Sequence, residues 1–236
     1  MANQVSNVLS NARTFANTDS NGISDATGIA YMNDALLELQ LKMIKQKEDL
    51  FLQESRRDIL AAEITGGSSP GRFLFPNDMW FLKTIEANLQ DTTNSSLYIT
   101  CSPIDIANTP NDASFDWLRS NQNINSPIVA IHGDWFELFP TPTQTMASGV
   151  KINYYLQPTQ YVLTTDYVVY PFNINIDMIA YKVSAMYARS HKDFDLAKEF
   201  EQKSDDNFEN FMYMLSGQQS QQPLRSKPLA LTGYEF

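Results

Sequence analysis

Cysteine and histidine are the scarcest chemically reactive residues in this chain. Its 236 residues include one cysteine, Cys101, and two histidines, His132 and His191. A single cysteine excludes an intrachain disulfide and a cysteine-based zinc site, and so few donors leave little for a transition metal. Because no base lies beside Cys101 in the sequence, we expect it to be a small buried residue.

Positive charge is also scarce, and no run of lysine or arginine occurs. The chain has 17 basic and 27 acidic residues, for a formal net charge of −10. Binding of DNA or RNA without sequence preference requires clustered bases that neutralise phosphates. We therefore expect no specific nucleic-acid binding. An acidic surface would repel DNA, which is useful only where DNA must slide past.

Long apolar runs are missing as well. No run approaches the roughly 18 apolar residues of a membrane span, and the first residues, MANQVSNVLSNARTF, lack the basic and apolar regions of a secretory signal. We expect a protein that does not cross a membrane by itself. Charged residues make up 19% of the chain, below the usual quarter. Such a surface suits a protein that packs against its own copies, and equally an ordinary secreted or viral protein.

The apolar residues that are present alternate most clearly between residues 128 and 158. Two runs, 128–139 and 150–156, flank a centre that contains Pro-Thr-Pro-Thr and Ala-Ser-Gly. Period-2 patterning with β-branched and aromatic residues, interrupted by proline and glycine, is typical of a β-hairpin. We expect this hairpin to form the core of a β region spanning roughly 55–170.

Helical spacing of apolar residues dominates both ends of the chain. Ser24 or Asp25 is expected to cap the second helix, and Asn175 the third. The spacing predicts helices at roughly 5–16, 24–52, 176–190 and 193–215. The predicted fold class is α+β, with the N-terminal and C-terminal helices forming a helical bundle around a central antiparallel β region. One domain would cover 1–216, followed by an extended C-terminal tail, 217–236, that has no periodic apolar face.

Shorter elements are expected within the β region. The segment 55–65 has a helix-like composition, yet the glycine-rich turn and the FLFP sequence after it favour strands, so both alternatives stay open and strands are preferred. Proline at 103 would suit the first position of a short helix in 102–105, and 114–118 reads as one helical turn. Further strands are expected at 73–76, 81–89 and 96–100.

Residues suited to chemistry are sparse. His132 and Asp134 could serve acid–base or metal roles, but a turn or strand-end position beside Gly133 is the favoured interpretation. Gly-rich 66–71 lacks the Lys-Ser/Thr of a phosphate loop, and no Gly-x-Ser-x-Gly elbow occurs. We expect no enzyme, no cofactor and no metal. The last helices carry acidic residues without calcium-loop spacing, interpreted as solvated faces: Asp193, Asp195, Asp205 and Asp206.

Aromatic residues, 12% of the chain, allow a second interpretation. Several of them could form a stacking surface for a sugar or a protein partner, although alternating aromatics more often fill a small β core. The residues concerned are Trp80, Trp117, Trp135, Tyr154 and Tyr155.

Taken in order, these segments resemble bacteriophage head-to-tail adaptor proteins, also called neck or connector proteins. ISDATGIAYMNDALLELQLKMI resembles the family's opening helix, and FLFPNDMWFLKTIEANL its bend into a strand. SPIDIANTPNDASF resembles the segment before the hairpin. GDWFELFPTPT with VKINYYLQPTQYVLTTD is similar to the paired strands, and IDMIAYKVSAMYARSHKDFDLAKEFEQKSDDNFENFMYML to the closing helix pair. The likeness covers roughly 5–215 and departs at SRRDILAAEITGGSSPGRF.

The resemblance implies a structural virion protein in the neck between capsid and tail, assembled in the host cytoplasm. It would form a ring of twelve copies beneath the portal protein, contact a tail, nozzle or neighbouring neck-ring protein, and let DNA pass through an acidic lumen. The tail would bind the portal through Leu229, Leu231, Tyr234 and Phe236. Alternatives are a tail-completion or stopper ring protein, or a carbohydrate-binding module of a tail appendage.

Overall fold

A computed structural model describes residues 3–59, 71–89, 97–104, 118 and 122–220. The chain divides into two compact units, which we call the helical unit (Met1–Gln46 with Thr159–Phe236) and the β unit (Lys47–Pro158). Every long described helix belongs to the first unit and every described strand to the second. The α+β class is therefore confirmed.

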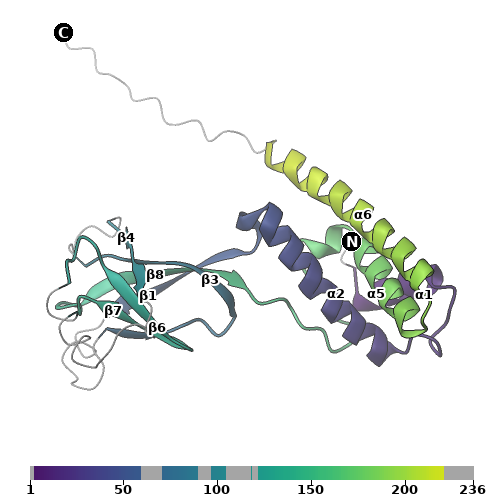
Figure 1. The fold of residues 1–236 in the computed structure, drawn as a ribbon, viewed down its shortest axis with the longest axis horizontal. Helices are drawn as coiled ribbons and strands as arrows, with labels where there is room; N and C mark the ends of the chain where they lie inside the picture. Colours follow the sequence, from purple (N-terminus) through teal and green to yellow (C-terminus); the bar gives the residue numbers. More distant parts are fainter. Residues whose placement is uncertain (1–2, 60–70, 90–96, 105–117, 119–121, 221–236) are drawn as a thin grey trace, which may run out of the picture. The chain divides into compact units, whose positions relative to one another are not determined.

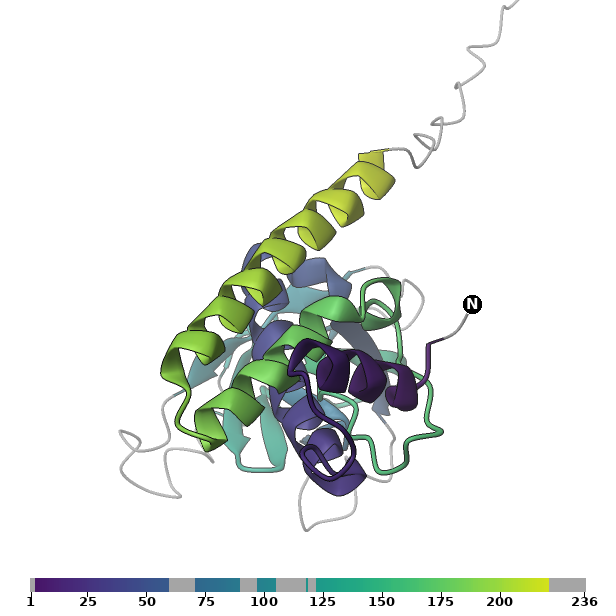
Figure 2. The same cartoon turned by 90° about the vertical axis from the view of Figure 1, so that its right-hand side faces the viewer.

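The helical unit contains α1 (Val5–Phe15), α2 (Asp25–Gln46), α5 (Asp177–Ser190) and α6 (Phe194–Ser220), with a short 3-10 helix, η3 (Phe172–Ile174), before α5. Figures 1 and 2 show α5 and α6 side by side, with α1 against α5. Apolar residues at helical spacing pack against one another, as expected of amphipathic helices in a bundle. The fully buried side chains include Val8, Leu9, Met32, Leu39, Ile179, Val183 and Phe211.

The helix ends show which sequence signals hold. Ser24 Oγ accepts a hydrogen bond from the Thr27 amide at 3.2 Å, so the predicted cap of α2 is confirmed. Asn175 Oδ1 accepts one from the Asp177 amide at 3.2 Å, but the N-cap position of α5 is Ile176, so the predicted cap is one residue too early. The predicted end of the second helix at residue 52 is wrong, because α2 stops at Gln46.

A strand begins where the second helix was expected to continue. The 3-10 helix η1 (Glu48–Leu50) follows α2, and Leu52 pairs with Tyr155 in a sheet. Sheet pairing satisfies the backbone groups of this segment and overrides its helical composition. The last helix is longer than expected: it runs through Gly217 to Ser220 rather than ending at 215.

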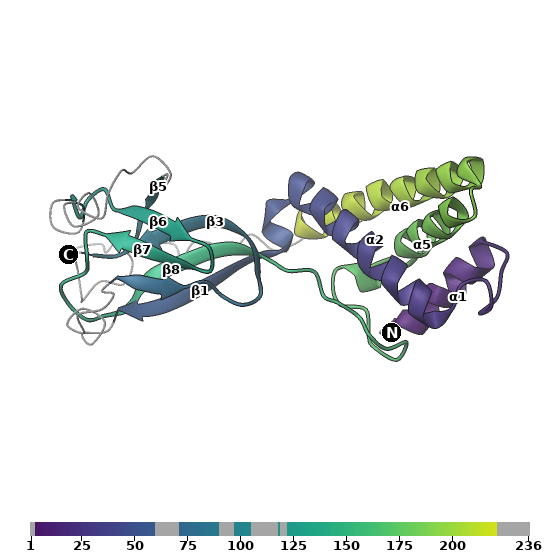
Figure 3. The same ribbon diagram turned by 60° about the horizontal axis from the view of Figure 1, so that its bottom comes forward.

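The described residues of the β unit form two four-stranded sheets, ordered β1-β8-β3-β4 and β2-β7-β6-β5. Among these strands, β5 and β6 pair in parallel and the other pairs are antiparallel. Figure 3 shows β8 between β1 and β3. The strand bounds are β1 Leu52–Ile59, β2 Arg72–Leu74, β3 Met79–Ala87, β4 Ile99–Thr100, β5 Ser102–Ile104, β6 Ile128–His132, β7 Trp135–Phe139 and β8 Met146–Leu156.

One apolar cluster joins the two sheets as a β-sandwich. Phe136 and Leu138 of β7 pack with Val150 and Ile152 of β8, and all four side chains are fully buried. Cys101 is buried in the same cluster, as expected. Buried and partly exposed residues alternate from Val150 to Tyr155 of β8, as the period-2 pattern predicted, whereas four successive residues of β7 are buried.

The partner of each run within 128–158 was predicted wrongly. The run 128–139 is itself a hairpin, β6 and β7, joined by a tight turn in which Gly133 has a φ of +66°. The run 150–156 lies in β8, which pairs with β1 and β3 in the other sheet. Alternation defines which face of a strand is buried but not which strand lies beside it, and both runs bury apolar faces in one core.

Two further corrections concern the β region. Residues 102–104 form strand β5 rather than the start of a helix, and Pro103, which lacks an amide hydrogen, is tolerated because β5 is an edge strand. The described strands run from Leu52 to Leu156, so the predicted bounds of the β region, 55–170, are wrong at both ends. Strands in 55–59, 72–74, 79–87 and 99–100 confirm the preferred interpretation of those segments. Residues 60–65 and most of 114–118 lie outside the described residues.

Candidate functional site

The four residues predicted to bind a portal protein lie outside the described part of the chain, which ends at Ser220. They are Leu229, Leu231, Tyr234 and Phe236. A candidate site among the described residues has to be found from exposure, charge and hydrogen bonding instead.

Residues 161–174, which precede α5 and which we call the strap, carry the most concentrated exposed apolar surface of the helical unit. Val162 is 76% exposed, and Tyr167 and Tyr170 are each 59% exposed. Contiguous exposed apolar patches on soluble domains mark interaction sites. The exposed large apolar residues of the strap are Val162, Leu163, Tyr167, Val169, Tyr170 and Ile174.

Two hydrogen bonds fix the strap to α2. Asn33 Oδ1 accepts from the Tyr161 amide at 2.9 Å, and Asn33 Nδ2 donates to the Tyr161 carbonyl at 3.0 Å. The Tyr161 ring is 4% exposed, and its hydroxyl accepts a bond from the Val169 amide at 2.9 Å. Burial raises the pKa of this phenol. Tyr161 therefore fixes the start of the strap to α2 and joins it to Val169.

The start of α1 fixes the middle of the strap. The amide of Val5 donates to the Asp166 carbonyl at 2.9 Å, and the amide of Ser6 donates to the Thr164 carbonyl at 2.9 Å. Gln4, which precedes α1, provides no side-chain cap. The strap thus accepts the hydrogen bonds that the first turn of any helix must place outside itself.

Inside the strap, the carboxylate of Asp166 accepts hydrogen bonds from the amides of Val162 and Leu163, at 3.2 and 2.9 Å. Val168 and Phe172 point inward and are 3% exposed. Asp166 is the strap's sole charged residue. A backbone held at several points with its apolar side chains outward is a preformed surface rather than a loose loop, which lowers the entropy cost of docking.

No local sequence pattern predicts this surface. The segment lacks the period of a helix or a strand, so its sequence predicts only a connecting loop with a polar centre at 164–166. The available signal was compositional, because Tyr-Val-Leu and Tyr-Val-Val-Tyr occur there without periodicity and beside one acidic residue. Exposure is decided by the bonds to α1 and α2, which no local pattern contains.

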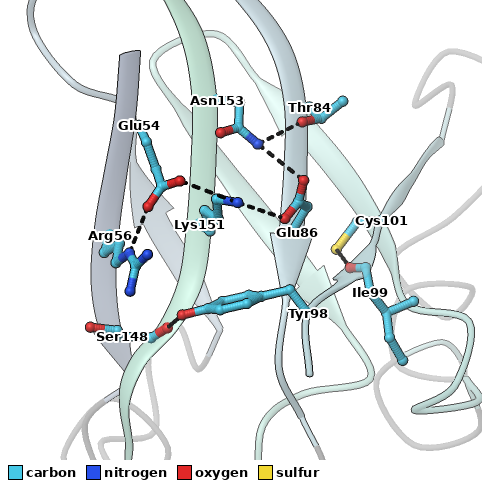
Figure 4. A network of polar contacts seen from close by, with 10 residues as sticks. All are labelled: Glu54, Arg56, Thr84, Glu86, Tyr98, Ile99, Cys101, Ser148, Lys151 and Asn153. Carbon is cyan, nitrogen blue, oxygen red and sulfur yellow. Dashed lines mark hydrogen bonds and ion pairs between the residues drawn. The ribbon is translucent and has the colours of Figure 1, made fainter. Parts of the chain in front are cut away.

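A second organised feature is the polar face of β1, β8 and β3 (Figure 4). Lys151 Nζ lies 3.2 Å from a carboxylate oxygen of Glu54 and 3.2 Å from one of Glu86. Glu54 also pairs with Arg56 at 2.6 Å. The hydrogen bonds from Arg56 and Lys151 lower the pKa of Glu54. Partial burial would lower the pKa of Lys151, but its bonds to Glu54 and Glu86 outweigh that effect and raise it.

Asn153 extends this polar face along β8. Its Nδ2 donates to Thr84 Oγ1 at 2.9 Å and to Glu86 Oε1 at 3.1 Å. Two acids are matched by two bases across three strands, so the charges satisfy one another. The arrangement is a cross-strand clamp and offers no uncompensated group to a ligand.

His132 and Asp134 do not form a chemical pair. His132 ends β6 and stacks on Trp135 with a centroid distance of 3.9 Å. Asp134 is exposed in the turn, where its carbonyl accepts a bond from the Phe75 amide. Burial, and secondarily the charge of Arg72, lower the pKa of His132. The favoured interpretation as turn residues is confirmed.

The candidate aromatic residues do not gather into one platform. The ring of Trp135 in β7 stacks on His132 of the neighbouring strand β6. On the other neighbouring strand, β2, the guanidinium of Arg72 lies 4.5 Å from the centroid of the Trp135 ring. Arg72 also pairs with the buried Glu137 at 3.4 Å. These contacts occupy the ring that a sugar would need.

The other aromatics have separate roles. Tyr154 belongs to the core and donates to Asp78 at 3.0 Å, and Trp80 packs on Phe81. Tyr155 is half-buried. Trp117 lies outside the described residues.

The acidic residues of the last helices do not converge either. Asp193 Oδ1 accepts from the Leu196 amide at 3.1 Å, at the start of α6, and Asp205 pairs with Lys42 at 2.7 Å. Asp195 and Asp206 are exposed. In the described segments, no three His, Cys, Asp or Glu side chains are placed to hold a metal ion.

None of the described helices is long and apolar enough to cross a bilayer. No protein-family model matches the sequence, and no curated protein matches it either. The geometry of the described residues therefore identifies the strap as the candidate site.

Proposed function

We propose that this chain is a structural virion protein that forms a ring beneath the portal, joins the phage capsid to the tail and lets DNA pass. The observation that supports this most is the strap, a preformed, apolar and nearly uncharged surface on the helical unit. Surfaces of this kind serve protein–protein association. The role is non-catalytic and needs no cofactor.

The partners in this proposal are the portal protein above, a tail, nozzle or further neck-ring protein below, and eleven other copies in the ring. Leu229, Leu231, Tyr234 and Phe236 would bind the portal. The helices would bundle around the β region to form the ring wall. The protein would reside in the neck of the virion, and in the host cytoplasm during assembly.

Charge supports the passage of DNA. The net charge of −10 would give the lumen a negative potential that keeps DNA from adhering to the wall. On the described polar face, Arg56 and Lys151 are paired with Glu54 and Glu86, which leaves little excess positive charge there to attract phosphate.

Co-purification tests the proposal. The full chain and a chain lacking 223–236 are each expressed with the portal protein of the same phage, and the portal is purified by affinity. We expect the full chain to be retained and the truncated chain, still folded by circular dichroism, to be lost. Failure of the full chain to bind contradicts the adaptor role. Binding only to a preassembled neck ring would identify a stopper, and a monomer that binds glycans would favour the carbohydrate-binding alternative.

A further inference from the structure

We infer that the strap of one copy docks head to tail against the α2–α6 groove of a second copy. This inference rests on the proposed ring and deepens it, because it names the two surfaces that a ring of identical subunits must match. A cyclic ring uses a heterologous interface, in which two different patches of one protomer contact its two neighbours.

The second patch lies where the end of α2 meets α6. A groove there is lined by Lys42, Lys45 and Gln46 of α2 and by Asp205, Phe208 and Glu209 of α6. Tyr213 follows Glu209 by one turn of α6 and is 82% exposed. Its exposed ring therefore lies next to the α6 side of the groove.

The two patches lie on different parts of the helical unit. The strap is held by Asn33 and by the first turn of α1, whereas the groove begins at Lys42. Nine to twelve residues of helix separate Asn33 from the groove lysines, about 14 to 18 Å along α2. Figures 1 and 3 agree that the first part of the loop preceding α5 lies on the side of α1 and α2 away from α6. Only its end approaches α6, where Asn175 Nδ2 donates to Asn207 Oδ1 at 3.5 Å. One copy can thus use both patches at once.

Charge favours a second copy as the occupant. Two chains of net charge −10 repel each other unless their contact surfaces carry little net charge. The strap has one charged residue, Asp166, whose carboxylate is bonded within the strap. In the groove, two lysines offset two carboxylates. These surfaces can meet without repulsion.

The area is also sufficient. Six large side chains that are 43–76% exposed present on the order of 600 Å² of apolar surface. One partner of a standard interface contributes about 800 Å². The strap therefore supplies most of one side of such an interface, with its polar flanks supplying the rest.

Disulfide trapping between copies tests the inference. Full-length Val162→Cys and Tyr213→Cys chains are mixed without portal and oxidised mildly. The control replaces the second chain with Lys198→Cys, another exposed α6 position. Native Cys101 is buried and does not compete. We expect about tenfold more cross-linked dimer than in the control mixture. Equal yields, or more dimer from Val162→Cys alone than from the mixture, would overturn the inference.

A second experiment separates this arrangement from a symmetric one. Val162→Asp with Tyr170→Asp disrupts the strap, and Tyr213→Asp disrupts the α6 side of the groove. All three positions are exposed, so folding should survive. Each variant alone should be monomeric by sedimentation velocity at concentrations where the wild type associates. An equimolar mixture retains one intact interface and should stop at a dimer. Larger assemblies from the mixture, or a wild type that never associates, contradict the inference; neither result bears on portal binding, which is measured separately.

Discussion

Asn33 of α2 and Tyr161 of the strap are joined by two hydrogen bonds, although 128 residues separate them in the sequence. The side-chain amide of Asn33 binds both the amide and the carbonyl of Tyr161, as a neighbouring strand would. This pair fixes the point at which the strap leaves the helical unit. It connects the fold to the surface on which the proposed assembly depends.

Asn33→Ala should loosen the strap. The variant leaves the two Tyr161 backbone groups without their partner, at a cost of about 1–3 kcal/mol. Hydrogen exchange of the amides of 161–169 should accelerate, while exchange in α6 changes little. Asn33→Asp keeps the acceptor and loses the donor, so its effect should be intermediate. Unchanged exchange in the strap of Asn33→Ala would show that α1 alone positions it.

Lys182 of α5 and Glu38 of α2 form a second link between segments that lie far apart in the sequence. Lys182 is 4% exposed, and its ammonium lies 2.6 Å from the half-exposed carboxylate of Glu38. Glu38→Ala leaves a buried charge without this partner, whereas Lys182→Met removes the charge and keeps the volume. We expect Glu38→Ala to lower the free energy of unfolding of the helical unit by about 1–3 kcal/mol and Lys182→Met to lower it less. Urea denaturation followed by circular dichroism measures both, and the reverse order would contradict this explanation.

The polar face of the β unit should give a pH-dependent stability. The pKa of Glu54 is lowered in the folded protein, so its ionised carboxylate stabilises the fold. This stabilisation is fully present above the pKa of Glu in the unfolded chain, about 4.3, and is lost as the pH falls through the lower pKa of the folded state. The pKa of Lys151 is raised in the folded protein, so its ammonium also stabilises the fold. This stabilisation is fully present below the pKa of Lys in the unfolded chain, about 10.4, and is lost as the pH rises through the higher pKa of the folded state.

Lys151→Met removes the centre of this clamp. The difference in stability from the wild type should be largest between about pH 5 and 10 and should shrink outside that range. All three tryptophans lie in the β unit, so tryptophan fluorescence during urea denaturation reports this unit. Lys151→Arg retains the charge and should resemble the wild type. A difference that is constant with pH would mean that Lys151 acts through packing alone.

Cys101 should report unfolding of the β unit. Burial, with a smaller contribution from the charge of Glu86, raises the pKa of its thiol to about 12. Compared with an ordinary thiol, the thiolate fraction near pH 8 is then about a thousandfold lower. Alkylation should be slow in the native protein and should accelerate at the urea concentration where tryptophan fluorescence changes. Rapid labelling without denaturant would contradict the buried position.

Local signals predicted the elements that local physics determines. Ser24 capped its helix, and alternation found most strands. The end of α2 was missed because Lys45 to Glu48 continue a helical composition, while the pairing of Leu52 with Tyr155 decides the outcome. The hairpin partners were missed for the same reason, since the order β1-β8-β3 is set by tertiary packing.

The candidate site was less accessible to sequence reasoning than the fold. The polar face left a trace, since Lys151 and Asn153 alternate with buried Val150 and Ile152 along β8. The strap left only an unperiodic apolar composition. Its exposure depends on Asn33 and on the first amides of α1, which lie more than a hundred residues away.

Electron microscopy of the portal complex tests the central claim most directly. Portal rings of the same phage are imaged alone, with the wild-type chain, and with the strap variant Val162→Asp and Tyr170→Asp. The proposed assembly predicts an additional closed ring on the portal with the wild type, and no closed ring with the strap variant. Portals that remain bare with the wild type, or a complete ring built by the strap variant, would contradict it.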